Sequence, residues 1–357
     1  MDIKKLLELA LKNNASDLHI LFGIAPTLRI NGELEPITGK TSFEKSEIKE
    51  AILSLLDENQ KKIFLEKKEL DFSFEFERGT RFRVNAYHAQ GSVAASFRLI
   101  KPRIPTIEEL NLPEMLRRFT ELRQGFVLVV GPTGHGKSTT VAAILEEINK
   151  NRKVHIVSIE DPIEYVLQAK RSIISQREIG GDSLSFQNAL RSCLREDPDV
   201  VFVGEMRDLE TIALALTIAE TGHLVFSTLH TNSSAQTIDR IIDVFPEGAK
   251  GQIKLQLASV LGAVISQRLI PSLNKDQLFP AVEILLSNPA IRTAIREGKT
   301  YMIDNVIQTS LEAGMVTLER SLAVLVRQGK IDLEAAQSFA LRPEDLNRQL
   351  RQEKTKG

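Results

Sequence analysis

A glycine-rich octapeptide constrains this chain more than any other stretch of its sequence. It spans residues 131–138 and reads Gly-Pro-Thr-Gly-His-Gly-Lys-Ser. The apolar run 126–130 precedes it, and apolar residues recur at helical spacing after it, at Val141, Ile144, Leu145 and Ile148. A strand, a glycine loop and a helix in this order are the context in which G-x-x-x-x-G-K-[ST] cradles phosphate groups. The sequence therefore predicts binding of a nucleoside triphosphate, and the alternative is an ordinary glycine turn before a helix.

Each position of the loop has a physical role in holding phosphate. Glycines allow a tight turn that aims N–H groups at phosphate oxygens, and the start of the helix adds the positive end of its dipole. Lys137 can reach the β- and γ-phosphates, and the Ser138 hydroxyl is a natural Mg²⁺ ligand. We expect the nucleotide to contact Gly131, Thr133, Gly134, His135, Gly136, Lys137, Ser138 and Thr139.

Length, charge balance and cysteine count exclude several kinds of protein. The chain has 357 residues, a length typical of about two domains, with 46 Lys and Arg against 47 Asp and Glu. This near-balance argues against broad binding to a nucleic-acid backbone. The one cysteine, Cys193, excludes an internal disulfide and a thiolate metal site, and is expected to be a small buried apolar residue. With no signal-peptide pattern and no run of about 18 apolar residues, the sequence predicts a cytoplasmic protein.

The pattern of apolar residues changes near residue 100. Residues 1–100 predict a small α+β domain on an antiparallel sheet, with helices at 1–13 and 46–66, a hairpin turning at Asn31-Gly32, and alternating strands at 71–77, 81–87 and 93–99 around a turn at 78–80. A stiff polar linker covers 101–106. Residues 107–357 alternate strands with helices, which indicates a parallel sheet, with strands at 126–130, 154–159, 200–203 and 224–228 and a mostly helical part beyond residue 250.

Polar side chains follow three of these strands. Glu160 and Glu164 follow the second strand, Glu205 the third and His230 the fourth. The carboxyl ends of parallel strands meet at one edge of a sheet, so these groups should gather beside the loop. Glu205 is expected at the Mg²⁺ shell, through a bound water, and Glu160 or Glu164 as the base that activates the attacking water. Helix capping or pairing with arginines is the alternative role for these acids.

His230 and the arginines of the first domain could each have either a structural or a functional role. His230 could bind the γ-phosphate or be a structural residue, and the arginines could form a solvated surface or a wall of the active site. Arg83 shares a strand face with Arg81, and Arg98 lies on another strand of the first domain. An arginine supplied to the γ-phosphate accelerates transfer by about 10³–10⁵. Because these arginines lie outside the second domain, we expect a neighbouring copy's nucleotide to pack against them in a ring.

Four motifs together resemble the secretion-type RecA-like ATPases and, within them, the retraction motors of type IV pili. They are the phosphate loop at 131–140, the acidic segment IEDPIEY at 159–165, the segment around Glu205 at 195–211, and TGHLVFSTLHTN at 221–232. ASDLHI at 15–20 and RFRVNAY at 81–87 are similar to the PAS-like first domain of that family. The resemblance covers essentially the whole chain.

The resemblance implies an α/β fold in which a RecA-like P-loop core follows a PAS-like α+β domain, and a homohexamer driven by ATP with Mg²⁺. It implies Glu164 as the general base, Glu205 as the acid on the metal side, His223 and His230 as coupling histidines, and first-domain arginines such as Arg83 and Arg98 at the nucleotide. It also implies an inner-membrane platform protein and the pilus machinery as partners, at the cytoplasmic face of the inner membrane, with neither nucleic acid nor a transmembrane segment.

Two features separate retraction motors from related export motors. The relatives that assemble or export carry a four-cysteine zinc module, which one cysteine cannot build. Retraction motors carry an AIRNLI segment, and this chain has Ala-Ile-Arg-Thr-Ala-Ile at 290–295, which departs at the fourth and fifth positions. The segment predicts a helix with Asn288 as its cap, Gly298 at its exit, and Arg292 and Arg296 facing outward. An accessory retraction ATPase, a nucleic-acid translocase and a non-hydrolysing nucleotide switch are the alternative functions.

Overall fold

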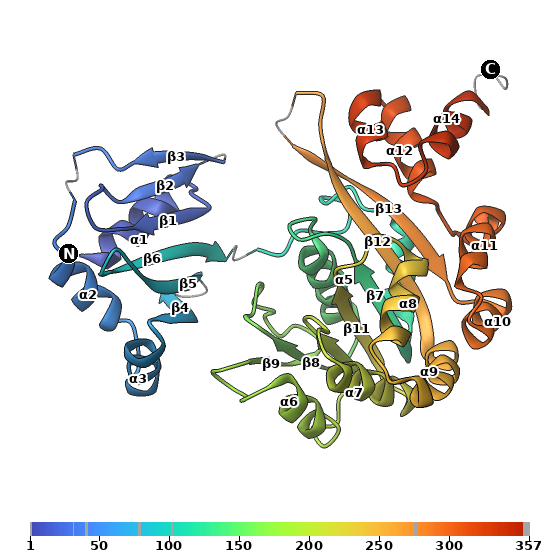
Figure 1. The fold of residues 1–357 in the computed structure, drawn as a ribbon, viewed down its shortest axis with the longest axis horizontal. Coiled ribbons are helices and arrows are strands. Elements are labelled where there is room, and N and C mark those ends of the chain that lie inside the picture. The colour runs from blue at the N-terminus through green and yellow to red at the C-terminus, as the bar shows by residue number, and fades with distance from the viewer. Residues whose placement is uncertain are drawn as a thin grey trace. The chain divides into compact units, whose positions relative to one another are not determined.

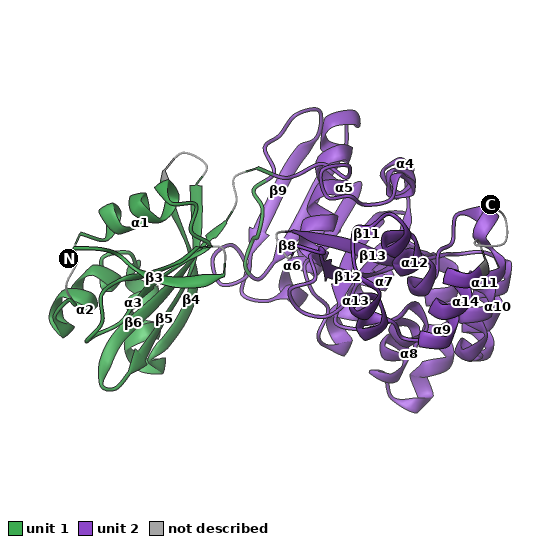
Figure 2. Ribbon diagram, turned by 90° about the horizontal axis from the view of Figure 1, so that it is seen from above, with its two compact units in different colours: residues 1–103, 162–166 green, residues 104–161, 167–357 purple. Residues whose placement is uncertain are grey.

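The chain forms two compact units in a computed structural model that describes residues 2–30, 32–39, 42–77, 80–100, 103–274 and 277–352. The first unit contains residues 1–103 with 162–166, and the second contains residues 104–161 with 167–357 (Figure 2). Parts of the predicted turns (Asn31, Arg78 and Gly79) and of the predicted linker (Lys101 and Pro102) lie outside the described residues.

The first unit is built on an antiparallel sheet, as the sequence predicts. The strand order is β3-β2-β1-β6-β5-β4 (Figure 1). Its strands are β1 (Asp17–Ile20), β2 (Thr27–Ile30), β3 (Glu33–Pro36), β4 (Glu69–Glu77), β5 (Thr80–Ala89) and β6 (Ser92–Ile100). Its helices are α1 (Ile3–Lys12), α2 (Lys45–Leu53) and α3 (Glu58–Lys67).

Alternation along β5 turns every second side chain of that strand toward the core. Phe82, Val84 and Phe97 are fully buried in a core with Leu6 and Leu7 of α1. The long helix expected over residues 46–66 is wrong, because the structure has two helices with a break between them. Asp57 starts the second helix: its carboxylate accepts from Gln60 N at 2.8 Å, and its own N–H donates to Gln60 Oε1 at 3.1 Å. Such a reciprocal cap fixes a new helix start.

The second unit has a mixed sheet in the order β13-β12-β7-β11-β10-β8-β9. Its strands are β7 (Gly125–Val130), β8 (His155–Glu160), β9 (Ile173–Glu178), β10 (Val200–Val203), β11 (Leu224–Leu229), β12 (Leu261–Pro271) and β13 (Leu278–Leu286). Its helices are α4 (Arg118–Glu121), α5 (Lys137–Asn151), α6 (Phe186–Cys193), α7 (Leu209–Glu220), α8 (Ser234–Asp243), α9 (Glu247–Val260), α10 (Pro289–Glu297), α11 (Ile303–Thr309), α12 (Leu318–Arg327), α13 (Leu333–Phe339) and α14 (Pro343–Gln352). Strands β12 and β13 pair antiparallel, and β7, β8, β9, β10 and β11 pair in parallel.

The expected helical character beyond residue 250 is wrong for residues 261–271 and 278–286. These segments form β12 and β13, and β12 pairs with β7, the strand that leads into the glycine loop. Ala263, Val264 and Ile265 are all fully buried. A strand buried on both faces has a continuous apolar run without period-two alternation, so its sequence does not distinguish it from a buried helix.

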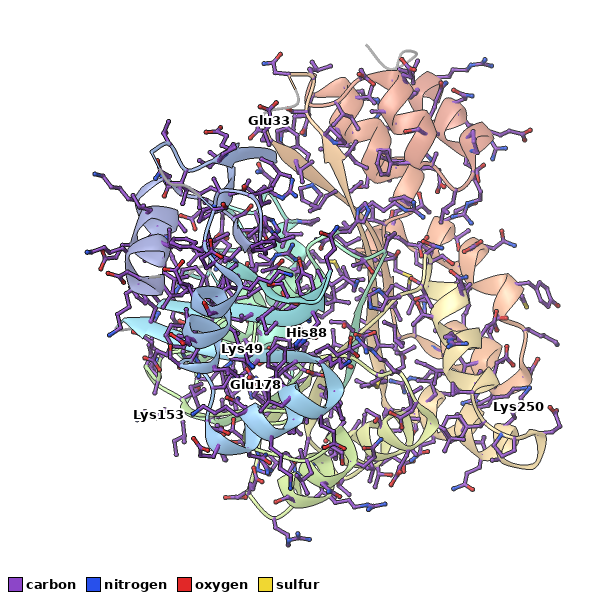
Figure 3. All side chains as sticks on the ribbon, turned by 60° about the vertical axis from the view of Figure 1, so that its left-hand side comes forward. Glu33, Lys49, His88, Lys153, Glu178 and Lys250 are labelled. Atoms are coloured by element: carbon purple, nitrogen blue, oxygen red, sulfur yellow. The ribbon has the colours of Figure 1, made fainter. Side chains whose placement is uncertain are left out.

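Helix α10 forms as the sequence predicts. Asn288 Oδ1 accepts from Ile291 N at 2.9 Å, and Gly298 ends the helix at φ +69°. Its apolar side packs into the core through Ile291, whereas Arg292 and Arg296 are exposed. The neighbouring α9 also has a charged outer side, where Lys250 pairs with Asp243 at 3.1 Å and Glu247 at 3.2 Å (Figure 3).

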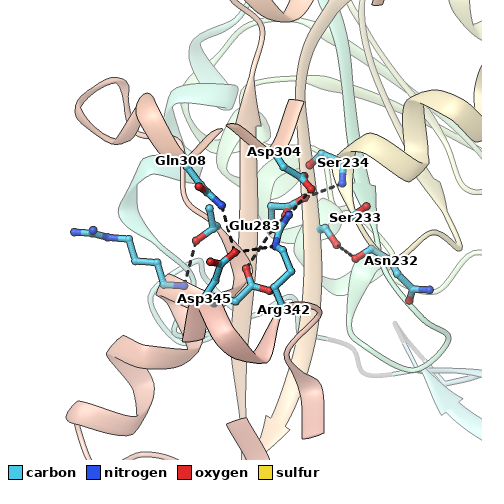
Figure 4. Close-up of polar contacts among 12 residues, drawn as sticks. Asn232, Ser233, Ser234, Glu283, Asp304, Gln308, Arg342 and Asp345 are labelled. Atoms are coloured by element: carbon cyan, nitrogen blue, oxygen red, sulfur yellow. Dashed lines mark hydrogen bonds and ion pairs between the residues drawn. The ribbon is translucent and has the colours of Figure 1, made fainter. Parts of the chain in front are cut away.

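One arginine connects the C-terminal helices to the sheet (Figure 4). Arg342, directly before α14, pairs with Asp304 of α11, with Glu319 of α12 at 3.3 Å and with Glu283 of β13 at 3.8 Å. Glu283 and Glu319 have side chains only 1% exposed. Burial raises the pKa of Glu283. The Ser234 N–H and hydroxyl and the charge of Arg342 act in the opposite direction and reduce this rise. Ser234 N, at the start of α8, donates to Glu283 Oε1 at 2.7 Å.

Replacing Arg342 with alanine should destabilise the second unit strongly. Removing one partner of a buried ion pair leaves the other charge uncompensated, which costs about 3–5 kcal/mol. Denaturant unfolding followed by circular dichroism measures the loss. Arg348→Ala is the matched control, because Arg348 pairs with Asp345 at 3.5 Å from a side chain that is 64% exposed. Equal unfolding midpoints for the two variants would contradict the role of Arg342.

Cys193 is fully buried in α6, as predicted. Burial raises the pKa of its thiol to about 12, and the charge of Glu196 acts in the same direction. Nucleophilic and metal-binding cysteines need a thiolate. The structure therefore gives Cys193 a packing role.

Candidate functional site

The carboxyl ends of three neighbouring strands bring the glycine loop, Glu205 and His230 together. Strand β11 lies between β7 and β10. Gly131 N, at the end of β7, donates to Leu229 O of β11 at 3.3 Å, and Met206 N, after β10, donates to Thr228 O at 3.3 Å. The side chains of Glu205 and His230 thus lie together beside the glycine loop, as the sequence predicts. The second unit alone supplies the three segments.

The glycine loop has the backbone of a phosphate cradle. Gly131, Gly134 and Gly136 all have positive φ, at +148°, +79° and +78°. A Cβ at Gly131 would lie 2.3 Å from Gln267 O of β12, so only glycine fits there. Gly136 caps the N-terminus of α5 without a side-chain hydrogen bond. The first N–H groups of a helix have no partner within it and suit an anion.

Strand β12 holds the loop, a contact that the sequence did not predict. The Gln267 amide donates to His135 O at 2.8 Å and accepts from the Thr140 hydroxyl at 2.7 Å. Leu269 N donates to His135 Nδ1 at 2.9 Å. Burial lowers the pKa of His135, as do the charges of Arg268 and Lys137, which suits an imidazole that accepts a hydrogen bond. His135 thus fixes the loop against β12.

Three side chains form a hydrogen-bonded line across the strand ends. Lys137 Nζ donates to Gly131 O and Pro132 O, both at 3.0 Å, and lies 3.4 Å from His230 Nδ1. His230 Nε2 lies 2.9 Å from Glu205 Oε1. An ammonium group can only donate, so His230 accepts at Nδ1 and donates its Nε2–H to Glu205. Thr133 Oγ1, 3.2 Å from Nδ1, completes the link between the loop and the histidine.

Glu205 is held ionised at the end of this line. Burial acts to raise the pKa of the Glu205 carboxyl, but the hydrogen bond and charge of Arg207 and the charge of Lys137 outweigh that effect and lower the pKa. Arg207 Nη2 donates to Glu205 Oε2 at 2.8 Å. A pocket of about 520 Å³ opens beside these groups, lined by Glu205, Arg207, His230, Asp239 and Arg240 among others. A carboxylate here can bind a hydrated cation or orient water.

The two candidate bases, Glu160 and Glu164, lie in different surroundings. Glu160 is buried in the second unit, where its Oε1 accepts from the Ser158 hydroxyl at 2.7 Å and from the Gln176 amide at 3.2 Å. Glu164 belongs to the first unit, where it lines a pocket of about 220 Å³ together with Arg83 and Arg98. The more open setting of Glu164 suits exchange of a proton with water better than that of Glu160.

His223 lies apart from the line of Lys137, His230 and Glu205. It precedes β11, whereas His230 follows that strand, so six strand residues separate them by about 20 Å. His223 Nδ1 contacts Ile218 O and Thr221 Oγ1, both at 3.0 Å. Its predicted coupling role stays a prediction.

No group of three or more His, Cys, Asp or Glu side chains in the described part of the chain could hold a metal ion by itself. None of the helices described is long and apolar enough to cross a bilayer.

Comparison with known proteins decides the family. Residues 1–298 match the family described as type II/IV secretion system protein. The chain belongs to this family. It is 46% identical over 345 residues to the type IV pilus retraction ATPase PilT of Pseudomonas aeruginosa, a match that covers 97% of this chain and 100% of that protein. The type IV pilus ATPase PilU of the same organism is 39% identical over 346 residues, which cover 97% of this chain and 90% of PilU.

A solved structure agrees with these relatives. The fold superposes on the crystal structure of the pilus retraction motor PilT with bound ADP with a TM-score of 0.91 and 41% identity, over 98% of this chain and 99% of that one. The RecA-like core is thereby confirmed, as is the resemblance to secretion-type ATPases, and the antiparallel sheet of the first unit fits the expected PAS-like domain.

The fit of Gly131 against β12 gives a direct test of the loop geometry. Gly131→Ala should destabilise the nucleotide-free protein by about 2–4 kcal/mol, from overpacking and backbone strain. Gly134→Ala should cost only about 1–2 kcal/mol, the strain of its positive φ, because a Cβ at Gly134 meets no atom within 4 Å. Thermal unfolding compares the two variants. A larger loss for Gly134→Ala would show that the loop is not packed against Gln267.

Proposed function

We propose that this protein is an ATP-hydrolysing motor that works as a homohexamer and powers the retraction of type IV pili. One observation carries the catalytic part: the line from Lys137 through His230 to Glu205 at the mouth of the glycine loop. A lysine, a histidine and an ionised acid beside a phosphate cradle are the parts of a site that binds a γ-phosphate and responds to its loss.

The nucleotide would take over contacts that the loop now makes with itself. Lys137 Nζ is held by two loop carbonyls, and the phosphate oxygens of ATP are stronger partners for an ammonium group. His230 would donate or accept at the γ-phosphate and relay its presence to Glu205. Thr133, Gly134, Gly136, Ser138 and Thr139 complete the cradle through their backbone N–H groups and hydroxyls.

The same residues fit Mg²⁺. Ser138 offers a hydroxyl at the start of α5, and Glu205 offers an ionised carboxylate, which acts through water. Mg²⁺ is commonly bound by one or two protein oxygens together with substrate phosphates, which agrees with the lack of an all-protein cluster among the described residues. When bound, the metal neutralises charge on the phosphates.

Hydrolysis needs a base that activates water and a cation that stabilises the negative charge on the γ-phosphate oxygens. Glu164 would accept a proton from water as the water oxygen bonds to the γ-phosphorus and the bond to the bridging oxygen breaks, releasing ADP and phosphate. Arg83 and Arg98 would stabilise the γ-oxygens, and they line one pocket with Glu164. Glu164 is only four residues beyond the last residue of β8, at most about 14 Å of chain. We therefore propose that a chain's own arginines serve its nucleotide, whereas the sequence alone predicts that they pack against the nucleotide of a neighbouring copy.

The relatives support the biological role. The retraction ATPase PilT is the more similar of the two Pseudomonas aeruginosa proteins, at 46% identity against 39% for the type IV pilus ATPase PilU, which supports a role in retraction. The near-neutral charge disfavours a nucleic-acid translocase, and the ionised Glu205 disfavours a non-hydrolysing switch. We propose a place at the cytoplasmic face of the inner membrane, held there by a platform protein of the pilus machinery, with His223 coupling neighbouring subunits.

Two glutamine variants separate the candidate bases. Glu164→Gln should bind ATP but lose hydrolysis by about 10²–10⁴-fold, the usual contribution of a general base. Glu160→Gln should mainly lower the thermal unfolding midpoint, since Glu160 is buried and hydrogen-bonded. Phosphate release and binding of a fluorescent ATP analogue are measured for both. Wild-type turnover in Glu164→Gln would remove Glu164 from the base role.

The exposed arginines of α10 test the mechanical role. Arg292→Ala combined with Arg296→Ala should leave ATP hydrolysis within about twofold of wild type, because both side chains are exposed. Within the described part of the chain they bond only to nearby residues, Arg292 to Ser287 and Arg296 to Thr293. Pilus retraction, followed as twitching in a strain that lacks its own motor, should be lost. Lys250→Ala is a surface control on α9 that should retain both activities. A parallel loss of hydrolysis would mean that α10 serves the ATPase itself.

A further inference from the structure

A row of charged side chains crosses the sheet of the first unit. Asp17 of β1 lies directly opposite Arg29 of β2 on one side and Arg98 of β6 on the other, and Arg98 lies opposite Arg83 of β5. Directly opposite residues of an antiparallel sheet point to the same face. Three guanidinium groups therefore share one face with a single carboxylate between two of them.

Asp17 holds Arg98 through one specific nitrogen. Asp17 Oδ1 accepts from Arg98 Nε at 2.8 Å, and Arg29 Nε lies 3.8 Å from Oδ2. The Ser16 hydroxyl donates to Oδ2 at 2.8 Å. The Asp17 side chain is 8% exposed, whereas that of Arg98 is 69% exposed. Asp17 is thus fixed in the sheet, and Arg98 extends from it.

Asp17 contacts Arg98 at Nε, so the two terminal nitrogens of the guanidinium group take no part in this ion pair. Across the described residues, the contact with Asp17 is the one ion pair that Arg98 makes. The two terminal nitrogens form the fork that matches a phosphate group. Arg98 lines the pocket that contains Arg83 and Glu164. A guanidinium anchored at Nε and open at its fork is preorganised for an anion.

Charge gives Asp17 a second effect. Like charges directly opposite each other in a sheet repel, so Arg83 and Arg98 need nearby anions, which Glu164 supplies inside the pocket and Asp17 supplies within the sheet. Asp17 offsets the positive charge on the side of Arg98 that faces away from Arg83. The Asp17 carboxylate therefore helps to keep two cations close together in one pocket.

We propose that Asp17 is a positioning residue for Arg98, which it aims at the γ-phosphoryl group of the bound nucleoside triphosphate. The inference rests on the proposed function and adds a residue that contacts neither nucleotide nor water in that mechanism. A purely structural ion pair would affect stability but not the chemical step in particular.

The test is steady-state ATP hydrolysis by the full-length wild type and by Asp17→Asn, Arg98→Ala and the double variant. Asp17→Asn should lower kcat by about 10- to 100-fold, since a small misplacement of a catalytic group costs up to ~10²-fold. KM for ATP should change by less than about threefold, because the glycine loop that binds the phosphates is untouched. The double variant should be no slower than Arg98→Ala, because Asp17 acts only through that arginine.

The matched control is Asp71→Asn. Asp71 lies on the same face of the same sheet and accepts from the Asn85 amide at 3.2 Å, with no arginine partner among the described residues. Its kcat should stay within about twofold of wild type. Thermal unfolding is measured for every variant, and Asp17→Glu, which keeps the charge but displaces it, replaces Asp17→Asn if that variant does not fold.

The outcomes separate the two levels of the proposal. A kcat for Asp17→Asn equal to that of Asp71→Asn, or a further loss in the double variant beyond Arg98→Ala, would overturn the positioning role while leaving the ATPase intact. A wild-type chain that does not hydrolyse ATP would reject the proposed function and the positioning role with it. A selective, non-additive loss of kcat would establish the role of Asp17.

Discussion

The parallel order of β7, β11 and β10 is the constraint on which the candidate site depends. It places the ends of three strands side by side, although the residues that follow them are separated by up to about a hundred positions in the chain. His230 can bridge Lys137 and Glu205 only because its strand lies between the other two. The fully buried core around Phe126, Val201 and Val225 holds that order, since each strand is packed on both faces.

Two further sets of contacts hold the residues of the site in place. On one side β12 clamps the glycine loop through Gln267 and His135. On the other, Glu283 fixes the start of α8, which follows the histidine segment, and is itself paired with Arg342 next to the C-terminal helices. The loop and the histidine segment are thus both tied to the β12–β13 hairpin. Such contacts restrict where the reacting groups can move, which is what a preorganised site requires.

The sequence predicts the site better than it predicts the support. Short motifs carry local information, so the glycine loop, the strand ends with Glu205 and His230, and the capped helix α10 could all be located from spacing alone. The contacts of Gln267 and Leu269 with His135 join residues more than 130 positions apart, and no local pattern encodes them. The hairpin of β12 and β13 was missed because strands buried on both faces lack alternation. Asp17 was identified only as part of a motif, since its role depends on which strand pairs with β1.

The proposed mechanism takes Arg83 and Arg98 from the first unit and the glycine loop from the second. The most direct measurement mixes two inactive variants, Lys137→Ala and Arg98→Ala, under conditions in which subunits exchange between rings, and follows ATP hydrolysis. If each chain's arginines serve its own nucleotide, mixing restores no activity, whereas wild-type chains mixed with either variant stay active. Recovery of hydrolysis in the mixture of the two variants would show that a neighbour donates Arg98 and would contradict the account.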